Sequence, residues 1–375
     1  MELSILVEPD GSVTFPSLAN ELVPIARSLD PSFSVAVVAD ALPSARYLAT
    51  KRIEVPAAAP LSELSLGELW DWHARTRTTA PSREQTRASR LDLKIEIATR
   101  LLRSCALCPW DCRIDRMTGQ TGFCGLGRDA YYTNEFLHFG EEAAIRPSHT
   151  VFLTGCSLRC VYCATGDSVV RPRQGTLLRP GEMAARIAAR AQQGARSVSF
   201  VGGNPDQNLL PILETLRACD TDLPVVWNSN LYAAPAVMEL LDGVVDIHVA
   251  DLKYGTDACA HRASGIPRYW ETVTANLERA AADAHMIVRH LVLPAHGICC
   301  TAPVLRWLAE RLPGVPVNLM AQYRPDHLVA AGRHEALRRA VTVGEIDAAR
   351  TLATRLGIPV VETRSLPSAP DGVPA

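Results

Sequence analysis

The chain has 375 residues, of which 47% are hydrophobic, and its 38 basic and 40 acidic side chains leave a formal charge of -2. This balance excludes the strongly basic surface that proteins use to bind nucleic acid or anionic membranes. Because the first residues do not resemble a signal peptide and no stretch is long enough to span a membrane, we expect a cytoplasmic protein. Eleven cysteines in such a chain indicate metal or redox chemistry rather than disulfides.

Residues 1–90 are predicted to form an N-terminal αβ appendage whose role the sequence does not reveal. Asp10-Gly11 is a favourable turn for a short β-hairpin. A helix and a strand are expected over 17–38, because apolar residues first recur at helical spacing and then run together. Further apolar spacing predicts helices over 61–77 and 91–102.

A Cys-rich segment is predicted over 91–140. It has the number and local density of cysteines that a four-ligand metal site needs. A second [4Fe-4S] cluster and a structural zinc ion would both satisfy them, and a segment that binds no metal is the third alternative. The four cysteines are Cys105, Cys108, Cys112 and Cys124.

From residue 141 to 345 the pattern alternates between apolar strands and helices, which predicts a parallel sheet covered by helices. Six β/α units indicate a partial or open barrel rather than a closed one of eight strands. The strands are expected over 151–154, 197–202, 225–230, 246–251, 286–293 and 315–320. Residues 346–375 are predicted to be a C-terminal extension that adds one more unit before a tail, over 366–375, expected to be disordered.

The first of these strands leads directly into Cys156, Cys160 and Cys163, spaced CxxxCxxC. Three thiolates on one tight loop with no fourth nearby suit a [4Fe-4S] cluster that leaves one iron open. A structural zinc site and three buried thiols are the alternatives. Zinc would need a fourth ligand close by, and the next cysteine downstream is Cys219.

Polar residues follow the later strands, where the loops of a β/α barrel face one opening. Convergent polar side chains are what a zwitterionic cofactor requires, because each buried polar atom needs a partner. The residues at these strand ends are Gly202, Gly203, Asn204, Asn228, Asn230, Asp251, Lys253, Arg289 and His296. We expect Lys253, Arg289 and His296 to anchor the substrate or a cofactor carboxylate.

Taken together, these motifs resemble the radical S-adenosylmethionine (SAM) superfamily, and in particular its PflX-like branch, the uncharacterised homologues of pyruvate formate-lyase activating enzyme. The match runs from Cys105 to Tyr323 and includes the GC-x-L-x-C-x-x-C loop, VVWNSN-x-Y and VRHLVLP-x-H. It implies a partial (β/α)6-type radical SAM barrel with a [4Fe-4S] cluster on the CxxxCxxC loop and Tyr162 near the adenine of SAM. It also implies SAM contacts along the strand ends named above, from Gly202 to Arg289. Asn204 stands where the family's GGE motif has an acid.

The resemblance implies reductive cleavage of SAM to a 5′-deoxyadenosyl radical that takes a hydrogen atom from a substrate. An electron donor of the flavodoxin or ferredoxin type would be a partner, and the substrate could be a protein, a peptide or a metabolite, with glycyl-radical activation of a partner protein as one case. The alternative functions are a zinc-stabilised binding protein and an Fe-S redox module that does not cleave SAM. We assign no role to the remaining cysteines, Cys219, Cys259, Cys299 and Cys300, beyond noting that Cys299 or Cys300 could donate a hydrogen atom.

Overall fold

The computed structural model describes residues 6–7, 13–14, 44–82, 87–332 and 334–361. Chain contacts divide it into two units, Met1–Leu42 and Pro43–Ala375. In the first unit, β1 (Leu6–Val7) pairs antiparallel with β2 (Val13–Thr14), which confirms the predicted hairpin. The helix and strand expected over 17–38 lie outside the described residues, as does the C-terminal tail.

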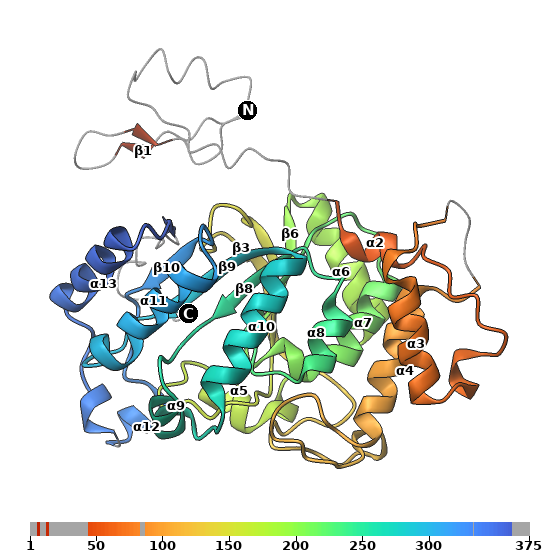
Figure 1. Ribbon diagram of the computed structural model, residues 1–375, viewed down its shortest axis with the longest axis horizontal. Helices are drawn as coiled ribbons and strands as arrows, with labels where there is room; N and C mark the ends of the chain where they lie inside the picture. Colours follow the sequence, from red (N-terminus) through yellow and green to blue (C-terminus); the bar gives the residue numbers. More distant parts are fainter. Residues whose placement is uncertain (1–5, 8–12, 15–43, 83–86, 333, 362–375) are drawn as a thin grey trace. The chain divides into compact units, whose positions relative to one another are not determined.

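A nine-stranded sheet forms the centre of the larger unit, in the order β11-β10-β9-β8-β7-β6-β4-β3-β5 (Figure 1). The strands from β4 to β11 in this order are parallel to their neighbours, whereas β3 is antiparallel to β4 and to β5. Because β5 and β11 do not pair with each other, the sheet is not closed, which confirms the predicted partial barrel. The strands are β3 (Tyr131–His138), β4 (Ser148–Leu153), β5 (Thr176–Leu177), β6 (Ser197–Val201), β7 (Val225–Ser229), β8 (Ile247–Asp251), β9 (His285–Leu291), β10 (Val317–Met320) and β11 (Val360–Val361).

Helices follow most of the parallel strands and pack along the outside of the sheet (Figure 1). All five residues of β7 are buried, as expected for a strand covered on both faces. Proline in the first turn begins α6, α8 and α11, where its missing N–H costs no hydrogen bond. The helices are α5 (Gly166–Val170), α6 (Pro180–Gln192), α7 (Leu209–Ala218), α8 (Pro235–Leu241), α9 (Asp257–Ser264), α10 (Tyr269–Asp283), α11 (Ala302–Arg311), α12 (His327–Ala330) and α13 (Val343–Arg355), with the π-helical turn η7 (Gly297–Thr301) before α11.

Three helices precede Cys105: α2 (Arg46–Thr50), α3 (Leu66–Arg75) and α4 (Arg90–Arg103). Helix α4 packs on α7 of the barrel, and α2 and α3 both contact α4. Lys94 in α4 is buried, and its Nζ donates to the backbone oxygens of Glu239 and Leu240 at 3.1 Å. Arg46 pairs with Asp283 at 2.8 Å. These contacts connect α2 and α4 to the barrel, and both helices belong to the unit Pro43–Ala375.

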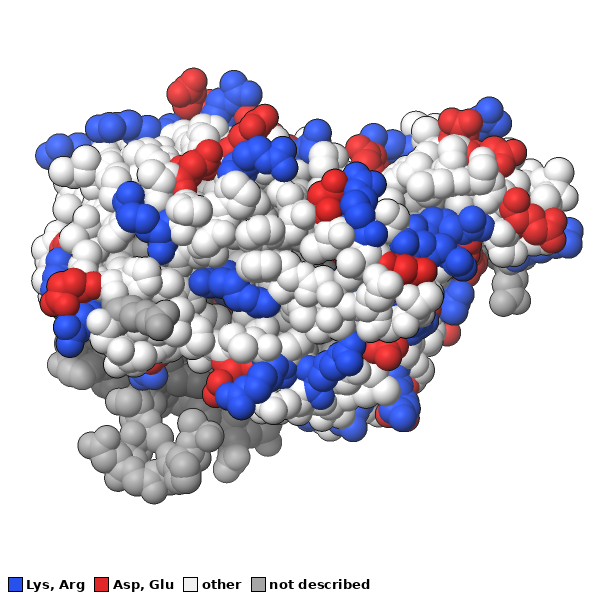
Figure 2. Space-filling view, turned by 90° about the horizontal axis from the view of Figure 1, so that it is seen from below, with Lys and Arg blue, Asp and Glu red and all other residues white. Residues whose placement is uncertain are grey.

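Positive and negative side chains are interspersed on the face that Figure 2 shows, with wide uncharged areas between them. This mixture agrees with the near-zero net charge and gives no large field of one sign on that face. Among the described residues, no helix combines the length and the apolar composition needed to cross a bilayer.

Candidate functional site

The CxxxCxxC loop leaves the carboxyl end of β4. Gly155, the residue before Cys156, has φ +71°, and a Cβ there would lie 2.6 Å from the side chain of Leu126. Glycine is therefore required on both conformational and steric grounds. Downstream, the loop is held against the end of α9 by backbone hydrogen bonds from Arg159 to Ser264 and from Val161 to Ala263, at 3.1 and 2.8 Å.

Hydrogen-bond donors are directed at the sulfur atoms of this loop. The Sγ of Cys156 accepts from the backbone N–H of Leu158 at 3.4 Å and from Nδ2 of Asn230 at 3.5 Å. Ser264 Oγ donates to Cys160 Sγ at 3.0 Å. Donors of this kind stabilise thiolates that ligate iron–sulfur clusters, so the residues present fit a cluster on this loop.

Burial sets the electrostatics of the same thiols. It raises the pKa of Cys156 and of Cys160 above the usual range, with the nearby Lys253 amino group opposing the rise at both thiols. For Lys253 itself burial lowers the pKa, but Asp251, at 2.7 Å, and the Cys160 thiolate raise it overall. A bound cation would be required to keep these thiols ionised at neutral pH.

Tyr162, predicted to lie near adenine, takes part in a buried chain of hydroxyl groups. Its hydroxyl lies 2.7 Å from that of Tyr254, which in turn lies 2.6 Å from Ser264 Oγ. Since Ser264 donates its proton to Cys160, Tyr254 donates to Ser264 and Tyr162 donates to Tyr254. The chain therefore ends at a cysteine sulfur with every proton directed toward it.

The Gly202-Gly203 turn after β6 packs directly on the CxxxCxxC loop. Both glycines have positive φ, +72° and +40°. A Cβ on Gly203 would lie 2.4 Å from the backbone oxygen of Gly155. The paired glycines therefore allow two strand-end loops to approach each other next to Cys156.

Asn204 belongs to a buried polar network with protein partners at both ends of its amide. Its Nδ2 donates to Asp206 and to Gln207 at 2.9 Å, and its Oδ1 accepts the backbone N–H of Asn230 at 3.1 Å. Asp206, two residues on, also accepts from Trp227 Nε1 at 2.7 Å and from Ser229 Oγ at 2.8 Å. Contact of Asn204 with SAM stays a prediction.

Asn228, at the end of β7, carries a polar atom that still needs a partner. The residue is 6% exposed, and among the described residues its Nδ2 has no hydrogen-bond partner. Buried polar atoms are almost always satisfied in native proteins. This orphaned donor therefore fits the predicted contact with a polar ligand.

Arg289 and His296 are bound by neighbouring protein groups. Arg289 pairs with Glu141 and with Glu142, whose carboxylate lies 2.6 and 2.8 Å from its guanidinium nitrogens. Burial alone would raise the pKa of Glu141, but His138 and Arg289 lower it to about 2. His296 Nδ1 lies 2.7 Å from the backbone oxygen of Pro294. The sequence analysis missed Glu141 and Glu142, although two adjacent acids in an apolar stretch were a usable signal.

The Cys-rich segment lies against the CxxxCxxC loop. Trp110 stacks on Phe123 with ring centroids 3.9 Å apart, and its Nε1 donates to the backbone oxygen of Ser157 at 2.7 Å. Arg159, within the loop, lies 4.7 Å above the Phe123 ring. The two groups of cysteines are therefore carried by segments in direct contact.

The next observation concerns the burial of the four thiols in the Cys-rich segment and the distances between them. Cys105, Cys108 and Cys124 are buried and Cys112 is half-buried. In the described chain, no three of these thiols all lie within 4.8 Å of one another. A single tetrahedral zinc ion would hold its sulfur ligands about 3.8 Å apart.

Comparison with known proteins assigns the family. The radical SAM superfamily matches residues 150–307. The uncharacterized protein MJ0674 of Methanocaldococcus jannaschii is 35% identical over 340 residues, which cover 87% of this chain and 98% of the relative.

Among solved structures, a radical SAM methyltransferase from Sphaerobacter thermophilus is 16% identical with a TM-score of 0.42, covering 81% of this chain and 94% of that one. Streptococcus suis SuiB bound to S-adenosylmethionine is 14% identical with a TM-score of 0.42, covering 55% of this chain and about half (48%) of SuiB. The matched family and the relative from Methanocaldococcus jannaschii together identify the family. The chain belongs to the radical SAM superfamily.

Proposed function

We propose that this protein cleaves SAM reductively at a [4Fe-4S] cluster held by Cys156, Cys160 and Cys163. The observation that carries the proposal is the loop itself, which places three thiols at the end of β4 with protein donors directed at two of the sulfurs. A loop with three ligands leaves one iron of the cluster open to SAM. Both rival functions lack a use for this open position.

When bound and reduced, such a cluster supplies the electron that splits SAM into methionine and a 5′-deoxyadenosyl radical. The protein chain binds and orients SAM and the substrate, and it excludes water from the site. Asn228 Nδ2, which has no partner among the described residues, would donate to a polar group of SAM, and the charged Lys253 would attract its carboxylate. The glycines at 202 and 203 let the loop that carries the three cysteines approach the backbone after β6.

The resemblance to the PflX-like branch adds a substrate class to the proposal. It points to hydrogen abstraction from a glycine of a partner protein, with a one-electron donor as the second partner. We extend the proposal to a second [4Fe-4S] cluster on the four cysteines of the Cys-rich segment, which is in direct contact with the cluster loop.

The test is anaerobic reconstitution with iron and sulfide, followed by chromatographic assay of 5′-deoxyadenosine after SAM and dithionite are added. We expect product from the wild-type protein and none from Cys160→Ala. Cys219→Ala, which alters a buried cysteine outside both groups, is the matched control and should retain activity.

Metal content separates the alternatives. About eight irons per chain would support two clusters, and about four would restrict the iron to one. A colourless protein with zinc alone would favour the binding protein. A brown protein that never cleaves SAM would favour the redox module. Either result would overturn the proposed function.

A further inference from the structure

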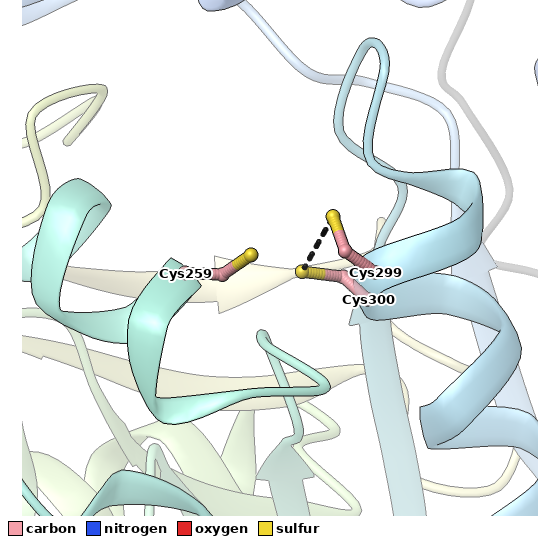
Figure 3. Close-up of side chains that lie close together, drawn as sticks. All are labelled: Cys259, Cys299 and Cys300. Atoms are coloured by element: carbon pink, nitrogen blue, oxygen red, sulfur yellow. Dashed lines mark hydrogen bonds between the residues drawn. The ribbon is translucent and has the colours of Figure 1, made fainter.

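Three cysteines outside both predicted metal-binding groups lie together at neighbouring strand ends. Cys259 is in α9, which follows β8, whereas Cys299 and Cys300 are in η7, which follows β9. Their sulfur atoms all lie within 4.8 Å of one another, and those of Cys299 and Cys300 are 4.0 Å apart. Figure 3 shows the three side chains pointing toward one another from the two elements. Among the described Cys, His, Asp and Glu residues, no other three meet this distance.

The backbone around these cysteines has a rare conformation and a close contact that requires glycine. The turn that carries Cys299 and Cys300 is π-helical, a rare conformation that occurs frequently at functional sites. The loop after β8 approaches this turn closely at Gly255, where a Cβ would lie 2.7 and 2.8 Å from the backbone oxygens of Cys299 and Cys300. A side chain at position 255 would therefore push α9 and the turn apart. The fold brings the three thiols together through a contact that requires glycine.

We propose that Cys259, Cys299 and Cys300 bind a zinc ion as three thiolate ligands, with the fourth position open. Zinc–sulfur bonds of about 2.3 Å in a tetrahedral site separate the sulfurs by about 3.8 Å, close to the spacing already present. Ligands of an iron–sulfur cluster bind different irons and must lie further apart. Soft sulfur donors at this spacing select a single soft ion.

The charge next to the three cysteines and their exposure to solvent are both consistent with a bound zinc ion. Three thiolates and one Zn²⁺ carry a net charge of -1, and Arg262 places Nη2 3.2 Å from Cys259 Sγ, where it offsets that charge. Cys259 and Cys300 are each only 1% exposed, whereas Cys299 is half-buried and leaves a route for the ion. No described His, Asp or Glu lies close enough to complete the set, so the fourth position falls to water or to an exogenous ligand.

The site is separate from the loop proposed to hold the cluster but is connected to it. The last residue of α9 is Ser264, whose hydroxyl donates to Cys160. Zinc on Cys259 would tie α9 to the turn after β9 and hold this donor in position. The inference does not rest on SAM cleavage, since zinc binding and 5′-deoxyadenosine formation are measured independently.

The test uses the anaerobically reconstituted full-length protein, equilibrated with zinc and freed of excess by gel filtration. Zinc and iron per chain are measured by mass spectrometry, and zinc-edge X-ray absorption counts the sulfur ligands. The proteins compared are the wild type and the variants Cys259→Ser, Cys299→Ser and Cys300→Ser, with Cys219→Ser as the matched control. Retained iron content and circular dichroism establish that each variant folds.

We expect each of the three variants to lose one zinc per chain, or to keep it with one sulfur fewer, while iron is unchanged. The wild type and Cys219→Ser should show three sulfur ligands at this zinc. Any zinc held instead by the Cys-rich segment would remain in every protein. Equal zinc content and sulfur count across all five proteins would overturn the proposal, as would a disulfide among the three cysteines in the reduced wild type.

Discussion

Gly203→Ala tests whether the close approach of two loops maintains the cluster site. A Cβ at this position would lie 2.4 Å from Gly155 O and 2.6 Å from Thr154 C. Both are backbone atoms, so the loop that begins at Cys156 has to move. Alanine at φ +40° adds about 1–2 kcal/mol of conformational strain. The steric overlap adds about 1–3 kcal/mol, the usual cost of overpacking.

Gly357→Ala provides the matched control, because Gly357 has φ +68° and a Cβ added there would meet no neighbouring atom within 4 Å. It carries the strain without the overlap. We therefore expect urea unfolding to give a loss of about 2–5 kcal/mol for Gly203→Ala and about 1–2 kcal/mol for the control. After reconstitution, only Gly203→Ala should bind less iron. Equal losses of stability with equal iron content would refute the reasoning that the loop contact constrains position 203.

Three further predictions concern the contacts of the site. Ser264→Ala removes the hydrogen-bond donor to Cys160. The loss of about 1 kcal/mol corresponds to a reduction potential of the cluster that is lower by about 40 mV. A redox titration followed by electron paramagnetic resonance measures this shift, and an unchanged potential would contradict the prediction. Arg289→Met leaves Glu141 and Glu142 buried without their cation, so chemical unfolding should show that the free energy of unfolding falls by about 3–5 kcal/mol. The control Arg338→Met removes an exposed ion pair and should lower it by less than about 1 kcal/mol. Similar losses in the two variants would argue against a buried network. Burial lowers the pKa of His290 to about 4, so the unfolded chain takes up the proton first and stability falls as pH drops from 6.5 toward 4. His290→Asn keeps a donor for Leu252 O and should reduce the loss of unfolding free energy between pH 7 and 5 by about 2 kcal/mol, whereas an identical pH profile would show that His290 does not contribute.

The sheet was predictable because its parallel strands are continuous apolar runs. All six strands expected between residues 151 and 320 are present, with ends shifted by a few residues. The sequence YYTNEFLH of β3 mixes polar and apolar residues, because this strand is antiparallel and much of it is only partly buried. Its periodicity gave no clear strand signal. The same local reasoning missed α9, a short and polar helix.

Contacts between distant parts of the sequence were beyond local reasoning. The ion pair of Arg46 with Asp283 joins positions 237 residues apart. In the same way, Ser264 and Cys160 are 104 residues apart. Neither pairing produces a pattern in the sequence, since each depends on how strands and helices are arranged in space.

Position 204 departs from the family motif, and its contacts give a physical reason for the change. The motif of the resembling family has an acid here, and this chain has Asn204 followed two residues later by Asp206. Asp206 accepts from Asn204, Trp227 and Ser229, so its carboxylate is matched by three donors.

Those contacts also fix which way the amide of Asn204 points. Because its nitrogen faces Asp206 and Gln207, its oxygen must face the backbone N–H of Asn230. Asn230 in turn donates from Nδ2 to Cys156 Sγ. An acid at 204 would lie beside the buried Asp206 carboxylate, and two like charges at that distance are unfavourable. The asparagine therefore lets the Asp206 carboxyl group fix an amide whose oxygen accepts the backbone N–H of Asn230, the residue that donates to Cys156.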